Sequence, residues 1–248
     1  MPNLNEHLKP TERGRLFCGG ALLEYNIYGR GNETVLLLHG NGEDHEIFND
    51  MIPALSEKYR VIAPDSRGQG HSDLGDGTLD YERMADDAAF LLARLGGEEP
   101  HVIGFSDGAI SGLLLALLYR GFVKSLTLIG CNLNPHGVKF PVRMSMLGSL
   151  IRHSALSIVS GDHERKRILT RMMLIEPHIS VKSLSSVTIP VMVVAGEHDV
   201  IKARHTDLIA ESLPSAEKHI IPHAGHGLPM EKPEELLKLI LPFLEKNS

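Results

Sequence analysis

The residues best suited to do chemistry lie in the segment Gly104-Phe105-Ser106-Asp107-Gly108, where a serine stands between two glycines. The short apolar run 101–105 precedes this serine, and a longer apolar run with helix-forming residues follows it directly. A strand, a tight turn and a helix in this order are typical of a nucleophile elbow, in which strained backbone angles expose the serine hydroxyl. We therefore predict that Ser106 is a nucleophile, rather than a serine that only forms a turn.

The two glycines and the helix support this interpretation. A side chain at Gly104 or Gly108 would collide with the neighbouring strand or helix. The helix that begins after Ser106 directs its unpaired N–H groups and the positive end of its dipole toward the same place, which suits a developing oxyanion. A serine hydroxyl is a poor nucleophile near neutral pH, so the site also needs a general base.

The rest of the chain alternates short apolar runs with helical patterns, which is typical of a mostly parallel sheet covered by helices. Predicted strands cover residues 15–18, 21–28, 34–38, 59–63, 101–105, 125–129, 189–196 and 218–221. Predicted helices cover residues 47–58, with a break near Pro53, 79–95, the segment after Ser106, 202–213 and 233–246. Ligands bind at the carboxyl ends of the strands in such sheets. Polar residues that follow different strands can therefore converge.

The alternation stops between residues 132 and 186, where helical patches cover 143–152 and 164–174. Because this stretch lies between two predicted core strands, we interpret it as an inserted helical cap. The core domain then comprises residues 1–131 and 187–248. The methionines of the cap fill its interior or line a pocket for apolar acyl groups; they are Met144, Met146, Met172 and Met173. Four basic residues hold a carboxylate or face water: His136, Arg143, Arg152 and His153.

Composition sets the broad class of the protein. A chain of 248 residues suffices for one large α/β domain, and a formal net charge of −6 provides no basic surface for nucleic acid or an anionic membrane. The two cysteines, Cys18 and Cys131, are predicted to be reduced thiols. Residues 1–15 are polar and lack a secretory signal, and the apolar run at 113–118 is too short to cross a bilayer. We predict a cytoplasmic protein without nucleic-acid or membrane partners; the oligomeric state stays open.

Nearly the whole chain resembles the α/β-hydrolase superfamily, through five segments in the family's order. They are His39-Gly40-Asn41-Gly42, Asp65-Ser66-Arg67-Gly68-Gln69-Gly70-His71-Ser72, Gly104-Phe105-Ser106-Asp107-Gly108, Gly196-Glu197-His198-Asp199 and Gly225-His226-Gly227. The resemblance implies an α/β-hydrolase fold with a mostly parallel sheet of about eight strands, helices on both faces and a small helical cap. The elbow and the short cap are most similar to small esterases and valacyclovirase-like (biphenyl-hydrolase-like) members.

The resemblance also implies a general base. The family's motif places the catalytic imidazole after Gly225, which implies His226, whereas His223 is the nearest competing histidine. The histidines at positions 219, 223 and 226 could also suggest a metal site. Pro222 and Gly225 prevent the single helix that would align them, so we expect no metal. We also expect no cofactor.

The acid that orients the base follows another predicted strand. In the family, a Gly-x-x-Asp segment supplies it, which implies Asp199, with Glu197 as the alternative. Some family members carry the acid after the preceding strand, where this chain has the uncharged Asn132 and Asn134.

The backbone N–H groups of Asn41 and Asp107 are expected to form the oxyanion hole. The Asp107 side chain has two interpretations. It could attract a substrate ammonium, as in an aminoacyl ester, or it could be a solvated or helix-capping acid, which we favour because the helix N-terminus attracts negative charge. His39 is expected to support this loop structurally. Asp65 and Arg67 are expected to tie the loop near Ser72 to the scaffold.

Together these residues predict a serine hydrolase without a cofactor that cleaves a small carboxylic ester, or an amide, lactone or thioester. Ser106 would attack the carbonyl, and water activated by His226 would release the acid from an acyl-enzyme. A serine at the elbow argues against the dehalogenase and epoxide hydrolase chemistry of the family, for which the resemblance implies a carboxylate nucleophile. The alternatives are a carbon–carbon bond hydrolase of a diketone, a hydrolase-fold binding protein without turnover, and acyl transfer to an alcohol.

Overall fold

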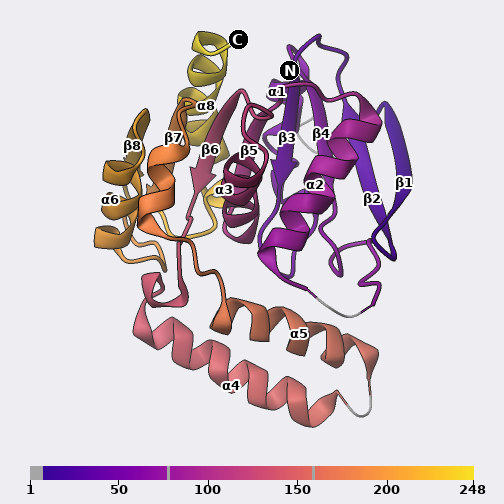
Figure 1. The fold of residues 1–248 in the computed structure, drawn as a ribbon, viewed down its shortest axis with the longest axis vertical. Helices are drawn as coiled ribbons and strands as arrows, with labels where there is room; N and C mark the ends of the chain where they lie inside the picture. The colour runs from indigo at the N-terminus through magenta and orange to yellow at the C-terminus, as the bar shows by residue number, and fades with distance from the viewer. Residues whose placement is uncertain (1–7, 77–78, 158–159) are drawn as a thin grey trace.

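The computed structural model describes residues 8–76, 79–157 and 160–248. Its centre is an eight-stranded sheet in the order β1-β2-β4-β3-β5-β6-β7-β8 (Figure 1). The pairs β1–β2 and β2–β4 are antiparallel, and every neighbouring pair from β4 to β8 is parallel. The strands are β1 (Glu12–Cys18), β2 (Ala21–Tyr28), β3 (Thr34–Leu38), β4 (Arg60–Pro64), β5 (His101–Phe105), β6 (Ser125–Ile129), β7 (Val191–Gly196) and β8 (Ala216–Ile221). The predicted fold class is confirmed.

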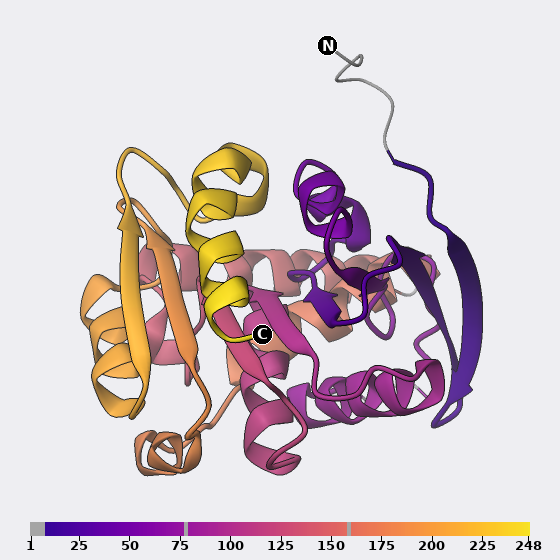
Figure 2. The ribbon, with the colours of Figure 1, turned by 90° about the horizontal axis from the view of Figure 1, so that it is seen from above.

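Helices cover both faces of the sheet (Figure 2). The central strands β3, β5 and β6 are buried throughout, as expected for parallel strands covered by helices on both faces. Alternate residues of these strands join two separate hydrophobic clusters, one on each face. One cluster packs against α2 (Tyr81–Leu95), α3 (Asp107–Leu118) and α6 (Ala203–Ser212), and the other packs against α1 (Ile52–Ser56), α7 (Leu228–Glu231) and α8 (Pro233–Lys246).

The predicted helix at residues 47–58 is two short pieces, a 3₁₀ helix at His45–Phe48 and α1 at Ile52–Ser56. Pro53 lies in the first turn of α1, where its missing N–H has no intrahelical partner to lose. The break between the two pieces therefore lies before Pro53, and Pro53 does not kink a continuous helix. The four-residue helix α7 was not predicted.

Residues 132–186 contain two long helices, α4 (Phe140–Leu156) and α5 (Gly161–Ile175), and short 3₁₀ helices at Pro135–Gly137 and Val181–Ser186. Both long helices extend beyond their predicted bounds. Figure 1 shows them side by side below the sheet, at the edge where α3 begins after β5. We call α4 and α5 the cap helices. No helix in the described part of the chain is long and apolar enough to cross a membrane.

Candidate active site

Three residues that are distant in sequence converge at the carboxyl ends of the strands. Ser106 follows β5, Asp199 follows β7, and His226 lies in the loop after β8. His226 Nε2 lies 2.9 Å from Ser106 Oγ, and His226 Nδ1 lies 2.8 Å from Asp199 Oδ1. An imidazole that donates its Nδ1–H to a carboxylate leaves Nε2 free to accept the serine proton. The geometry is therefore that of a nucleophile with its general base.

The backbone at Ser106 has the strained conformation of a nucleophile elbow. Its φ is 53° and its ψ is −115°, and its N–H donates to the Ile129 carbonyl at 2.8 Å. An added Cβ at Gly108 would lie 2.0 Å from the Leu38 carbonyl oxygen, and one at Gly104 would lie 2.4 Å from the Gly108 carbonyl oxygen. The predicted need for both glycines is confirmed.

The competing acid and base, Glu197 and His223, contact each other. Asp199 is 3% exposed, and its Oδ1 also accepts the Ile201 N–H at 2.8 Å. Glu197 is half exposed and instead accepts the His223 N–H at 2.9 Å. The His223 side chain is 88% exposed. Asp199 and His226 are thus the pair that the fold brings to Ser106.

The three histidines considered for a metal do not form a ligand cluster within the described ranges. The group whose potential ligand atoms lie within 4.8 Å of one another there is Glu24, Asp65 and His71. Its carboxylates already have partners, because Glu24 accepts hydrogen bonds from Arg13 and Arg15, and Asp65 accepts from the His71 backbone N–H. These contacts explain the cluster as part of the scaffold.

Two backbone N–H groups are available beside Ser106. Among hydrogen bonds between described residues, none is donated by the N–H of Asn41 or Asp107. The amides on either side of Asn41 are held in place, since the Gly40 N–H donates to Glu43 Oε2 at 3.1 Å and the Gly42 N–H donates to Gln69 Oε1 at 2.5 Å. The loop is thereby fixed while the Asn41 N–H stays free for a ligand.

The Asp107 side chain corrects a prediction. We favoured a solvated or helix-capping acid, but Asp107 is only 3% exposed. Its Oδ1 accepts the Tyr81 hydroxyl and its Oδ2 accepts the Asn41 side-chain amide, each at 2.8 Å. Burial raises the pKa of this carboxyl to about 6, although hydrogen bonds from Asn41 and Tyr81 oppose the shift. The start of α2 and the Asn41 loop enclose the elbow, and this enclosure removes Asp107 from solvent.

Residues that were not predicted hold His226 in position. Glu231 accepts hydrogen bonds from the N–H groups of Gly225 and Gly227, at 2.6 Å and 3.1 Å. An added Cβ at Gly130 would lie 2.7 Å from His226 Cε1, so the absence of a side chain there makes room for the imidazole. The sequence offered no signal for Glu231, while Gly130 directly follows a predicted strand.

The expected structural residues support the loops of the site. His39 is fully buried, its Nδ1 lies 2.7 Å from the Gly40 carbonyl, and its Nε2 accepts the Ser66 N–H at 2.8 Å. Burial lowers the pKa of His39, which favours this neutral role. Ser72 Oγ donates to the Asp65 carbonyl at 2.7 Å, and Arg67 donates to Asp87 at 2.6 Å and 2.8 Å. The predicted ties are present.

A small cavity of about 30 Å³, the catalytic cavity, contains Ser106 and His226. Met146 and Met173 of the cap helices line it, whereas Met172 belongs to the core and Met144 is exposed. None of the cavity-lining residues among those described is a lysine or an arginine. Its other apolar lining residues are Val138, Val200 and Ile201.

Three of the four basic residues considered for a carboxylate contact other side chains: His136, Arg143 and His153. Arg143 Nη1 donates to His136 Nδ1 at 3.1 Å, and His153 Nδ1 lies 2.9 Å from His163 Nδ1. Arg152 is exposed. None of the four basic residues lines the catalytic cavity, so they hold no carboxylate at this site.

Comparison with known proteins finds relatives among hydrolases. A profile of the α/β hydrolase fold matches residues 33–144. The chain is 28% identical to serine hydrolase BPHL of Homo sapiens, over 93% of this chain and 86% of the relative. It is 26% identical to a 2-hydroxy-6-oxo-6-(2'-aminophenyl)hexa-2,4-dienoic acid hydrolase of Metapseudomonas resinovorans, over 93% of this chain and 90% of the relative.

Solved structures share the fold over nearly the full length. A thermophilic esterase from Thermogutta terrifontis matches with a TM-score of 0.77 at 23% identity, covering 96% of this chain and 100% of that chain. The sequence relatives, the matching profile and this fold show that the chain has the α/β-hydrolase fold and is an enzyme of the serine hydrolase type.

Proposed function

We propose that this hydrolase cleaves a small carboxylic ester through an acyl-enzyme on Ser106. The observation that carries the proposal is the hydrogen-bonded series Ser106–His226–Asp199, with distances of 2.9 Å and 2.8 Å. The free N–H groups of Asn41 and Asp107 support it, because acyl transfer needs two donors for the oxyanion.

In the acylation step, Ser106 Oγ attacks the carbonyl carbon while His226 Nε2 accepts the hydroxyl proton. The oxyanion accepts hydrogen bonds from the N–H groups of Asn41 and Asp107. The carbon–oxygen bond to the alcohol then breaks as His226 returns the proton to the leaving oxygen. Asp199 keeps the imidazole in the required tautomer and stabilises its positive charge.

In the deacylation step, water attacks the acyl carbon and gives its proton to His226 Nε2. The tetrahedral intermediate collapses, the bond to Ser106 Oγ breaks, and the serine takes the proton back from His226. The products are the acid and the regenerated enzyme. Every proton in the cycle moves through one imidazole nitrogen, so the mechanism calls on no cofactor.

The charge of the catalytic cavity favours an ester over an acidic diketone. Asp107 and Glu176 line the cavity, and its described lining has no lysine or arginine. The dienoate substrate expected of a carbon–carbon bond hydrolase carries a carboxylate that such a lining repels. Carbon–carbon bond cleavage, suggested by the relative from Metapseudomonas resinovorans, is therefore the second candidate.

An aminoacyl ester is a more specific version of the same proposal. Asp107 is buried beside Ser106, and the side chains that donate hydrogen bonds to its carboxylate, from Tyr81 and Asn41, are uncharged. A substrate ammonium near the scissile carbonyl would supply the missing counter-charge. We expect Asp107→Asn to reduce the preference for an alanine ester over the matched propionate ester. This preference is the kcat/KM for the alanine ester divided by the kcat/KM for the propionate ester. An unchanged ratio would remove the ammonium from the proposal.

The test of the proposed function is the hydrolysis of p-nitrophenyl esters, from acetate to octanoate, by wild type and Ser106→Ala. The variant should lose about 10⁴- to 10⁶-fold in kcat, as expected when a serine nucleophile is removed from a triad. If wild type is inactive on every ester but cleaves the carbon–carbon bond of a dienoate diketone, the second candidate is supported instead.

A further inference from the structure

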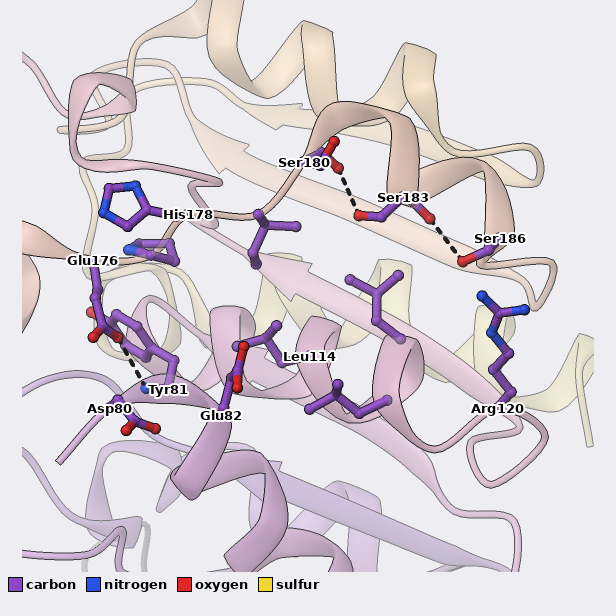
Figure 3. A pocket seen from close by; sticks show the side chains of 14 residues that line it. Asp80, Tyr81, Glu82, Leu114, Arg120, Glu176, His178, Ser180, Ser183 and Ser186 are labelled. Carbon is purple, nitrogen blue, oxygen red and sulfur yellow. Dashed lines mark hydrogen bonds between the residues drawn. The ribbon is translucent and has the colours of Figure 1, made fainter. Parts of the chain in front are cut away.

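A second pocket adjoins the catalytic cavity along the outer side of α3, and we call it the outer pocket. Its volume is about 560 Å³, whereas the catalytic cavity holds about 30 Å³. Ligand-binding pockets commonly enclose about 300–1,000 Å³. Figure 3 shows Tyr81 and Glu176 at one end of the outer pocket, Leu114 in the middle and Arg120 at the other end.

Tyr81 and Glu176 form the boundary between the two spaces, because both residues line the outer pocket and the catalytic cavity. Their connecting hydrogen bond, from the Tyr81 N–H to Glu176 Oε2, is 3.4 Å long, near the limit for such a bond. The catalytic cavity is too small for an extended substrate. The outer pocket, which shares Tyr81 and Glu176 with this cavity, offers the additional volume that a longer group would need.

The hydrogen bonds indicate which half of an ester takes this path. His226 must protonate the leaving oxygen, so the alcohol half lies on the side of His226 and Asp199. Tyr81 contacts neither His226 nor Asp199 by a hydrogen bond between described residues, and its hydroxyl instead donates to Asp107 Oδ1 at 2.8 Å. The outer pocket therefore extends from the acyl side of the scissile bond.

The lining of the outer pocket suits an apolar chain. Leu114, Leu117 and Leu118 of α3 form an apolar stripe, and Leu118 is 50% exposed. Burial of such an exposed surface by a ligand is favourable. Glu176 stands at the end nearest the triad, where a carboxylate on the acyl group would be repelled.

We propose that the outer pocket binds the acyl chain of the substrate, an elongated apolar group without a carboxylate next to its carbonyl. This inference rests on the proposed ester hydrolysis and names the substrate class of the same site. Medium-chain acyl esters are then better substrates than acetate, because each further methylene leaves water for the leucine stripe.

The test fills the pocket from the 3₁₀ helix at Val181–Ser186. Ser183 lines the outer pocket, whereas Ser185 lies outside its lining and is exposed. Both serines donate a hydrogen bond to the carbonyl three residues earlier, at 2.7 Å and 2.9 Å. The variants Ser183→Phe and Ser185→Phe therefore lose the same local contact and differ in whether the new ring occupies the pocket.

We expect kcat/KM of wild type to rise roughly threefold to fourfold per methylene from butyrate to octanoate. With each series expressed relative to acetate hydrolysis by the same variant, Ser183→Phe should abolish the rise and Ser185→Phe should keep it. A rise that persists in Ser183→Phe would overturn the proposal. So would a length dependence that appears only in the alcohol half of acetate esters.

A binding measurement separates this inference from the proposed function. Calorimetric titration of Ser106→Ala with p-nitrophenyl octanoate reports the pocket without turnover. Adding Ser183→Phe should weaken binding at least about tenfold, and adding Ser185→Phe should leave it unchanged. Equal affinities in the two double variants would refute the outer pocket as the acyl site. If wild type hydrolyses none of the esters but the two double variants still differ in affinity, the proposed reaction is refuted and the acyl site is not.

Discussion

At the scale of single residues, Asp199 and Glu197 follow the same strand yet contact different histidines. Asp199 Oδ1 contacts His226 Nδ1 at 2.8 Å, and Glu197 accepts the His223 N–H at 2.9 Å. We expect Asp199→Asn to lower kcat by about 10⁴-fold, because an amide no longer fixes the productive tautomer of the base. Glu197→Gln serves as the control and should change kcat by less than about twofold. Similar losses in both variants, measured on one ester, would show that the assignment of the acid is wrong.

Asp107 makes the stability of the protein depend on pH. Burial raises its pKa from 3.8 to about 6, so the folded state binds this proton more tightly than the unfolded chain. The folded state therefore loses stability as the pH rises from about 4 to above 6, by about 1–3 kcal/mol. Asp107→Asn removes the buried charge. We therefore expect the free energy of unfolding of the variant, minus that of wild type, to become more positive as the pH rises from 4 to 8. Urea unfolding at pH 4, 6 and 8 measures this difference. The exposed Asp50→Asn should show no such trend, and a flat profile for Asp107→Asn would contradict the burial of its charge.

At the scale of elements, the short helix α7 positions the base. Glu231, in α7, accepts the N–H groups that flank His226, from Gly225 and Gly227. We expect Glu231→Ala to lower kcat about 10- to 100-fold with little change in KM, because small displacements of a catalytic group reduce the rate steeply. Glu231→Gln, which keeps one carbonyl acceptor, should recover part of the loss. The exposed Glu234→Ala is the matched control, and an equal effect on kcat there would exclude a specific role for Glu231.

The same scale shows what a sequence can predict about elements. All eight strands were expected from short runs rich in apolar and β-branched residues, and the run at 34–38 also predicted burial on both faces because four consecutive residues there are apolar. Helix α7 was missed because four residues are too few to display a helical period. The cap helices were predicted too short, since exposed apolar residues such as Phe140 and Ile151 blur their amphipathic pattern.

At the scale of the whole molecule, the fold brings distant segments to one edge of the sheet. Ser106, Asp199 and His226 were recognisable because each lies after a predicted strand, in a short segment that resembles a family motif. Tyr81 and Glu176 were not, because they reach the cavity from the start of α2 and the end of α5, through contacts that no local pattern records. The misjudged environment of Asp107 has the same origin, since its partners come from other parts of the chain.

The most direct test of the central claim is covalent labelling with a fluorophosphonate, followed by peptide mapping by mass spectrometry. Ser106 and His226 in the observed contact should give one phosphonyl group per chain, on the peptide that contains Ser106. Ser106→Ala should take up none, and His226→Ala should react far more slowly. Labelling at another residue, or ester hydrolysis that continues undiminished in Ser106→Ala, would contradict an acyl-enzyme on Ser106.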